Sequence, residues 1–326
     1  MNAIPIIIFV AIIASLPLFG AFERMIHYLN LIFFFAALTG AWNLISGFAG
    51  QLSLGHSGFF AVGAYTSTLL YMNHGITPWV GMVIGGILSL PTAFLIGYPT
   101  FRLRGTYFVL STLALAEVIR RLIMYFKGLT KGSVGISLPV TGDPRLLQFP
   151  NETGYYYLFL GMALFMVYLG WRIRWSRLGY FILGIREDED AAESLGVNAR
   201  KNKLIVFMIS AFFTAMMGSM YAQWKCYIDP DAVGGIELSI QIALAGILGG
   251  MGTVWGPFAG ATILILAHVL GLGLSGGLVG GVYMLYGALL ILAILVRPQG
   301  IVSAIEEGYQ KVMALLFPRK EIHGTP

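Results

Sequence analysis

Long apolar runs alternate with short polar connections along most of the 326-residue chain. A bilayer core of about 30 Å needs roughly 20 mostly apolar residues for each helical crossing. Ten runs come near that length: 4–20, 29–45, 59–72, 80–99, 107–124, 155–171, 204–222, 238–250, 258–273 and 278–296. The pattern therefore predicts an all-α polytopic membrane protein, a bundle of about ten transmembrane helices with eight to eleven as the range.

The first run, 4–20, has the length of a secretory signal but not its flanks. No basic residue precedes it, and no small-residue cleavage pattern follows it. We therefore expect a retained helix. The domain prediction is one transmembrane domain over 1–303 and a cytoplasmic C-terminal tail over 304–326.

Composition supports the membrane assignment and excludes several functions. The chain is 57% hydrophobic and 11% charged, whereas soluble domains carry roughly 25% charged residues. Its single cysteine, Cys226, and the lack of Cys/His clusters predict no disulfide, no metal and no cofactor. The sequence contains no phosphate-binding loop of the G-x-x-x-x-G-K-[ST] type and no catalytic signature, so we expect a non-enzymatic protein.

Charge is concentrated in the polar segment 172–203, between two apolar runs. When this segment is placed in the cytoplasm, thirteen of the twenty Lys and Arg residues lie on that side and five on the other. This bias follows the positive-inside rule. We therefore predict a cytoplasmic loop at 172–203 and cytoplasmic termini. The asymmetry also accounts for the net charge of +5, so nucleic-acid binding is not indicated.

Within this loop, residues 187–195 predict a short helix. Four acidic side chains crowd its first turn, where they favour the positive end of the helix dipole. Gly196 can end the helix in a left-handed conformation. Ala191 and Ala192 make it thin, so that another surface can approach closely. Two interpretations stay open from the residues alone, a helix that docks a soluble partner and a solvated surface helix.

The run Asp190-Ala191-Ala192, followed after three residues by Gly196, resembles the E-A-A-x-x-x-G coupling loop of ATP-binding-cassette importer permeases. Asp stands where that pattern usually has Glu. The blocks SGFAGQLSLGHSGFFAVGAY (46–65) and LGGMGTVWGP (248–257) are similar to those of branched-chain amino acid importer permeases, and the loop resembles their LivM-like subunits. One departure is Lys131, which stands where the family commonly has glycine.

The resemblance implies a permease subunit of an ATP-driven importer for branched-chain or related hydrophobic amino acids, in the inner membrane of a bacterium or archaeon. Its implied partners are two cytoplasmic ATPase subunits, a second homologous permease in a heterodimer, an extracytoplasmic substrate-binding protein and membrane lipid. Urea or amide importers of the same family, and a gradient-driven secondary transporter, are the alternatives. The residues expected to couple to the ATPase are Arg186, Glu187, Asp188, Glu189, Asp190, Ala191, Ala192 and Gly196.

A second candidate region lies where glycines interrupt an apolar stretch. Irregular backbone is tolerated at membrane depth only where it is buried in protein or lines a wet cavity. The segment is therefore a candidate for the substrate path, although a simple turn at the cytoplasmic face also fits the span count. The path candidates are Gly50, Gln51, Ser53, Gly55, His56 and Ser57.

Glu117 lies inside the apolar run 107–124, where an isolated charge costs at least ~2.5 kcal/mol. Arg120 and Arg121 follow at the i+3 and i+4 positions, which meet on a helix surface. We expect an ion pair that either locks the bundle or exchanges partners during gating. Glycines spaced four apart also predict close helix packing. These are Gly81/Gly85, Gly246/Gly250, Gly252/Gly256/Gly260 and Gly273/Gly277/Gly281.

The segment 127–154 is expected to be the longest exterior loop. A soluble substrate-binding protein needs such a surface, but a long loop can also be a plain connector. The sequence leaves both interpretations open.

Overall fold

The computed structural model describes residues 15–19, 23–103, 105–274, 279–296, 300 and 302 of the chain. Most of the first apolar run and the whole tail 304–326 lie outside these residues. The predicted helix at 4–20 and the predicted position of the two termini therefore stay predictions.

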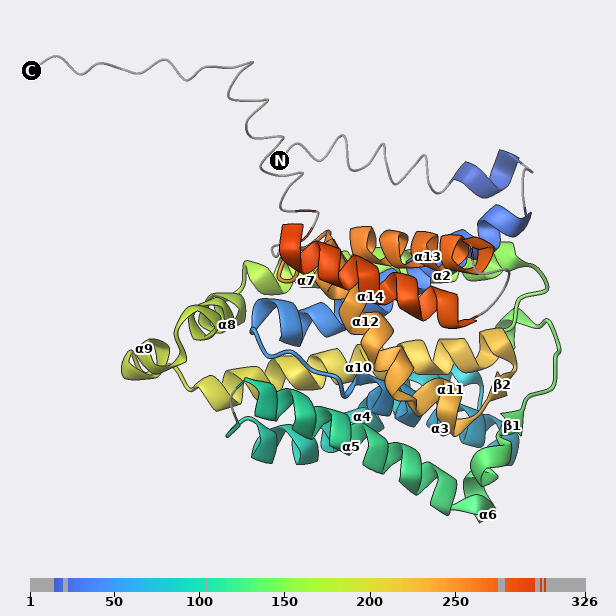
Figure 1. Ribbon diagram of the computed structural model, residues 1–326. Helices are drawn as coiled ribbons and strands as arrows, with labels where there is room; N and C mark the ends of the chain where they lie inside the picture. Colours follow the sequence, from blue (N-terminus) through green and yellow to red (C-terminus); the bar gives the residue numbers. More distant parts are fainter. Residues whose placement is uncertain are drawn as a thin grey trace, which may run out of the picture.

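Most of the described chain is helical, and the long helices run along one common axis (Figure 1). The first part of the chain contains η1 (Leu16–Phe19), α2 (Glu23–Asn43), η2 (Leu44–Phe48, a π-helix), α3 (His56–His74), α4 (Pro78–Thr100), α5 (Thr106–Tyr125), α6 (Lys127–Thr130), η3 (Gly132–Val134), β1 (Ile136–Ser137) and η4 (Pro144–Leu146). The second part contains α7 (Glu152–Arg174), α8 (Arg177–Glu187), α9 (Glu189–Ser194), α10 (Ala199–Lys225), β2 (Tyr227–Ile228), α11 (Pro230–Gly234), α12 (Ile236–Gly249), α13 (Gly256–Leu274) and α14 (Val279–Val296).

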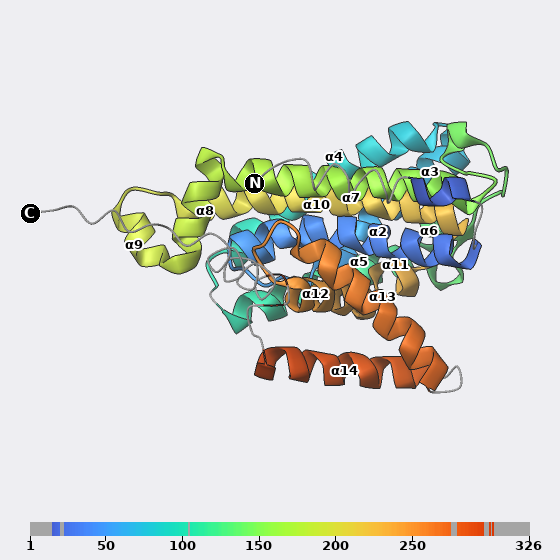
Figure 2. The same cartoon turned by 90° about the horizontal axis from the view of Figure 1, so that it is seen from above.

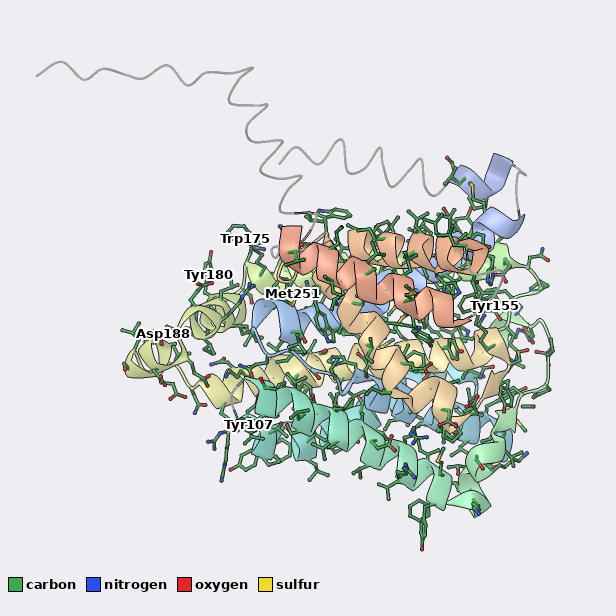
Figure 3. The ribbon with its side chains drawn as sticks, viewed as in Figure 1. Tyr107, Tyr155, Trp175, Tyr180, Asp188 and Met251 are labelled. Atoms are coloured by element: carbon green, nitrogen blue, oxygen red, sulfur yellow. The ribbon has the colours of Figure 1, made fainter. Side chains whose placement is uncertain are left out.

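The bundle has two different ends. Helices α8 and α9 project beyond the long helices at one end, while α6, β1 and β2 gather at the other (Figure 1). We call these the α9 end and the β end. The labelled side chains of Asp188 and Tyr155 mark the two ends in Figure 3. Short connections join most of the described helices, whereas a longer segment, residues 131–151, joins α6 to α7 at the β end.

Among the described residues, six helical stretches are long and apolar enough to cross a membrane. They are 25–48, 78–100, 152–174, 199–225, 230–249 and 256–274. The all-α polytopic class is thus confirmed, but ten crossings are not. Helix α5 instead carries three charged residues close together in its second half, Glu117, Arg120 and Arg121, and the apolar part of α14, Gly280–Leu292, is shorter than these six stretches.

Packing is organised around α2 and α10. Helix α10 lies against α3 and α4, and α2 lies against α7 and α13. Their shared core is rich in aromatic rings, such as Trp42, Phe34 and Phe59, which are almost fully buried. Helix α14 contacts α12 and α13 and lies at the edge of the bundle, as the view from above shows (Figure 2).

The long loop at the β end is folded rather than extended. Strand β1 pairs antiparallel with β2 through Ile136↔Ile228 and Ser137↔Tyr227, so the loop is tied to the end of α10. Lys131 has φ +59°, a left-handed conformation that favours glycine. Glycine would adopt this conformation without the strain that a lysine has here. This gives a physical reason why glycine is the more common residue at the position of Lys131 in the pattern described above.

Candidate functional site

Helices α8 and α9 form the projecting α9 end. Helix α8 begins after Ser176, whose Oγ accepts a hydrogen bond from the Gly179 amide (3.2 Å). It ends at Glu187 because Asp188 takes an extended conformation, φ −153°. Asp188 then caps α9, since its Oδ1 accepts from the Ala191 amide at 3.0 Å. The N-caps Ser176 and Asp188 thus start two separate helices, α8 and α9, within the polar segment 172–203.

The predicted helix 187–195 is therefore wrong in its extent. The helix has six residues, Glu189–Ser194, and Glu187 belongs to α8. Its predicted end is confirmed: Gly196 has φ +86°. The Gly196 amide donates to the Glu193 carbonyl and the Val197 amide to the Ala192 carbonyl, the two bonds of a Schellman cap.

Two contacts hold α9 against the bundle. Ala192 is buried and packs with Ile185 and Ala199. Lys203 Nζ, whose side chain is 2% exposed, lies 2.7 Å from Glu189 Oε2. A buried lysine needs an anionic partner, because removing it from water alone costs several kcal/mol. Of the predicted coupling residues, Glu189 and Ala192 therefore position α9 from its inner side.

The other predicted residues on and beside α9 face outward. Glu187, Asp188, Asp190, Ala191 and Gly196 are exposed. The sequence analysis missed two further residues, Glu193 and Leu195. Leu195 is 85% exposed, and Glu193 lines a surface hollow of about 420 Å³ beside α9. The acidic face thus includes an apolar side chain and an adjoining depression.

Glu189→Gln is expected to lower the melting temperature of the purified protein. The substitution leaves Lys203 buried opposite a neutral amide, and breaking a buried pair on one side costs about 3–5 kcal/mol. Thermal unfolding in detergent measures the effect, with Glu193→Gln on the same helix as the control. A double variant, Glu189→Gln with Lys203→Met, should recover most of the loss. Equal melting temperatures for Glu189→Gln and the wild type would contradict a stabilising role for the pair.

Two arginines connect this end to the interior of the bundle. Arg186 of α8 donates from Nη1 to the Gly47 carbonyl (2.7 Å), inside the π-helix that ends α2. Arg174, the last residue of α7, donates from Nη1 to the Gly252 carbonyl (2.8 Å), in the turn between α12 and α13. The carbonyl oxygens at the end of a helix and in a glycine turn are not all occupied by backbone hydrogen bonds. They can therefore accept these hydrogen bonds from the two arginines.

The π-helix and the glycine turn are also joined directly. Asn43 Oδ1 accepts from the Gly252 amide, and Asn43 Nδ2 donates to the Thr253 carbonyl, both at 2.9 Å. Asn43 is 3% exposed. Sequence reasoning selected Arg186 as a candidate and Gly252 only as a packing glycine, and it missed Asn43, Gly47 and Arg174. A buried asparagine in an apolar run beside a glycine-rich turn is the signal that could have indicated them.

The predicted path segment continues from the π-helix into the bundle. Residues 49–55 are irregular, and α3 begins only at His56. The Leu54 amide donates to Thr112 Oγ1 (3.2 Å), and Trp42 Nε1 donates to the Ser53 carbonyl (2.7 Å). The segment thus runs from the α9 end toward mid-bundle, with its backbone groups bonded to neighbouring helices.

His56 and Ser57 lie where α3 begins. His56 is fully buried, and its Nε2 lies 2.8 Å from Ser210 Oγ. Ser210 donates its own proton to the Ala41 carbonyl (2.6 Å), so His56 Nε2 is the donor in this pair. The hydroxyl group of Ser239 on α12 donates a hydrogen bond to the hydroxyl oxygen of Ser57 (2.9 Å).

The six path candidates are placed differently. Ser53, Gly55, His56 and Ser57 are buried, whereas Gln51 is half-buried and Gly50 is exposed. Ser57 also lines a cavity that opens at the surface of the chain.

The expected ion pair on α5 is present. Glu117 accepts from Arg120 Nε (2.7 Å) and Nη2 (2.6 Å) and from Arg121 Nε (2.6 Å). Arg120 also binds Asp231 of α11, a partner that is 111 residues away and that the helix spacing could not predict. The ion pair therefore joins α5 to α11 as well as neighbouring turns of α5.

Two open cavities lie beside this ion pair. One, of about 450 Å³, is lined by Glu117, Arg120, Asp231 and Glu237 among others. The second, of about 290 Å³, is mostly apolar and has Ser57 and Leu113 in its wall. In the described part of the chain, no three His, Cys, Asp or Glu side chains cluster as metal ligands would.

The sequence matches the family described as "Branched-chain amino acid transport system / permease component" over residues 24–294. It is 32% identical over 285 residues to the high-affinity branched-chain amino acid transport system permease protein LivM of Escherichia coli K12. That alignment covers 79% of this chain and 65% of the relative, so the chain spans less than two thirds of the relative's length.

Two other relatives extend the comparison. The permease protein LivH of the same transport system in Escherichia coli K12 is 26% identical over 301 residues, covering 87% of this chain and 96% of LivH. The probable LivM protein of Methanocaldococcus jannaschii is 24% identical over 237 residues, covering 68% and 65%. Bacterial and archaeal proteins therefore resemble the same helical region of the chain.

Proposed function

This chain belongs to the permease component family of branched-chain amino acid transport systems, and on that premise we propose that it is the membrane subunit of an ATP-driven importer. The proposed cargo is branched-chain or related hydrophobic amino acids, as the names of LivM and LivH relatives suggest. Six apolar helices support a multi-pass position in the inner membrane. The sequence has no phosphate-binding loop, so ATP hydrolysis would belong to separate subunits.

The α9 end is the proposed contact with the ATPases. It projects beyond the bundle, and the short helix α9 is fixed by two caps, a buried alanine and the Glu189–Lys203 pair. A rigid acidic helix of this kind suits the groove of a soluble partner better than a free loop would. This projecting, anchored helix is the observation that carries the proposal. The proposed orientation, with the α9 end and both termini in the cytoplasm, follows from the distribution of basic residues in the sequence.

The β end is then the proposed contact with an extracytoplasmic substrate-binding protein. The strand pair β1–β2 holds the loop that follows α6 against the end of α10, which gives a partner a defined surface. Since relatives of two kinds, LivM and LivH, come from the same transport system, the proposed assembly contains a second, homologous permease, with two ATPases and membrane lipid.

Charge reversal of two exposed acids at the α9 end, Glu187 of α8 and Glu193 of α9, tests this assignment. We expect Glu187→Lys with Glu193→Lys to reduce co-purification of the ATPase subunits at least tenfold, because both acids are exposed beside α9. Affinity purification from membranes that express the whole transporter measures this. Arg145→Glu, an exposed charge reversal at the β end, is the matched control and should retain the ATPases. Full ATPase recovery with the double variant would contradict the proposed docking face.

A further inference from the structure

We propose that the groove between α5, α11 and the start of α12 holds an amino acid on its way through the membrane. Arg120 and the carboxylates around it would bind the carboxylate and ammonium groups of the amino acid. The adjoining apolar cavity would hold its aliphatic side chain. This inference rests on the proposed transport function and adds to it a site on this subunit.

The first argument is the cost of charge on this helix. The side chains of Glu117 and Arg121 are 43% and 70% exposed at the surface of this chain. A charge at the centre of a span is costly in lipid, so ionisable groups there face a bundle interior or a water-filled cavity. The face of α5 that carries Glu117 is therefore covered by water or protein rather than by hydrocarbon.

The second argument is the pairing of opposite charges from separate elements. Arg120 binds Glu117 on its own helix and Asp231 on α11. Glu237, the second residue of α12, accepts a hydrogen bond from the Tyr283 hydroxyl (2.7 Å) and lines the same cavity. A zwitterion can bind such a set by exchange, with its carboxylate on Arg120 and its ammonium on a released carboxylate. The net charge of the groove then stays unchanged, which a simple anion or cation could not achieve.

The third argument is the shape of the adjoining space. The charged cavity of about 450 Å³ and the apolar cavity of about 290 Å³ share Glu117 and Ile236 in their walls. Leu110 and Leu113 of α5 form the apolar side of the smaller cavity. Pockets for small ligands combine such an apolar wall with a few polar groups that fix orientation. A molecule with a two-charge head and a short branched chain fits across both cavities.

The fourth argument is the depth of the groove within the helix bundle. Glu117 is the twelfth of the twenty residues of α5, and Ser57, in the apolar cavity, is the second residue of a helix that begins inside the bundle. Helix α12 begins beside it, since Ser239 is bonded to Ser57. Helices that begin within the membrane recur at the binding sites of transporters. The groove therefore leads from the β end toward the middle of the bundle.

Uptake by variants of the complete transporter tests the site. With L-[³H]leucine in proteoliposomes, we expect Arg120→Gln to lower the maximal uptake rate at least tenfold while basal ATPase activity stays within twofold. Arg120→Lys should recover part of the rate. Arg121→Gln is the matched control: it also removes a partner of Glu117 but lines neither cavity, so uptake should stay within twofold. Equal losses in both Gln variants would indicate a structural ion pair and overturn the proposal.

Thiol labelling provides a readout that does not depend on transport. The native free cysteine, Cys226, is first replaced by serine so that it does not react with the label. In that background, a charged maleimide should label Leu113→Cys, and L-leucine should slow the labelling. Leu95→Cys on α4, an apolar position that is 72% exposed, should stay unlabelled. Absence of labelling at Leu113→Cys would contradict the proposal that the groove contains water.

The two possible failures are distinguishable. Wild-type proteoliposomes that take up no leucine with ATP would refute the transport function itself. Normal wild-type uptake, with Arg120→Gln unchanged and no leucine protection at Leu113→Cys, would refute only the groove.

Discussion

Replacing Gly218 by alanine is expected to remove most of the folded protein. Gly218 of α10 faces α3, and a Cβ atom there would overlap the Phe60 carbonyl oxygen. The contact is reciprocal, because a Cβ at Gly63 of α3 would overlap the Ala215 carbonyl oxygen of α10. The two backbones therefore touch at this crossing, and a single methyl group forces them apart.

The expected cost exceeds the roughly 1–3 kcal/mol of ordinary overpacking. In those cases a side chain can change its rotamer, whereas here the obstacle is backbone on both sides. Helices α3 and α10 also carry His56 and Ser210, whose hydrogen bond lies between them. Moving the helices apart would break this bond as well as the packing.

Fluorescence-detected size exclusion of detergent-solubilised protein measures the outcome, together with the melting temperature of any monodisperse fraction. Gly161→Ala on α7 is the control, since a Cβ there has no neighbouring atom within 4 Å. Alanine at that position should be neutral or slightly stabilising, because glycine costs about 1 kcal/mol in a helix interior. A Gly218→Ala protein as stable as the Gly161→Ala protein would contradict the backbone contact.

The spacing of glycines predicted part of this packing. Gly260 does lie against the backbone of α12, and Gly256 against Gly250, the C-cap residue of α12, as the four-residue spacing indicated. Gly273, predicted in the same way, has open space where its Cβ would be. Gly63 and Gly218 were missed because each meets its partner through a crossing of helices distant in sequence. Spacing identifies a face that allows close approach but not the helix that uses it.

The contacts of the polar residues also divide into those that the sequence predicted and those that depend on the tertiary fold. The pairing of Glu117 with Arg120 and Arg121 follows from helix periodicity, and it is present. Asp231 joins the same cluster only because the chain folds α11 against α5. The sequence of four consecutive acids, 187–190, gave no indication of which one would cap α9. Asp188 does so, and Glu189 turns inward to Lys203, which is fourteen residues away.

The number of crossings could not be derived from hydropathy alone. The run 107–124 was counted as a span like the others, although three charged residues close together in the second half of α5, Glu117, Arg120 and Arg121, set it apart from the six apolar helices of the described residues. The π-helix and the irregular segment after it were also beyond sequence reasoning in detail. They depend on Asn43, whose side chain bonds the Gly252 turn of a hairpin some 210 residues further along.

Arg186→Ala is expected to uncouple ATP hydrolysis from uptake while the ATPases remain bound. Arg186 lies on α8, next to the proposed docking helix, and its guanidinium holds the Gly47 carbonyl of the π-helix. Gly50 (φ +67°) and Gly252 (φ +80°) lie against the same side chain, and a Cβ at either would collide with it. A movement of α8 would therefore reach the end of α2 and the α12–α13 turn through this one residue.

A hydrogen bond from a charged donor contributes about 1.5–3 kcal/mol, and 1.4 kcal/mol corresponds to a tenfold change in an equilibrium. We therefore expect ATP-driven leucine uptake in proteoliposomes to fall at least tenfold, with ATPase co-purification unchanged. Arg177→Ala, an exposed arginine at the start of α8, is the control and should transport normally. Loss of bound ATPase in Arg186→Ala would assign the residue to the docking surface, and normal uptake would show that α8 moves the bundle by another contact.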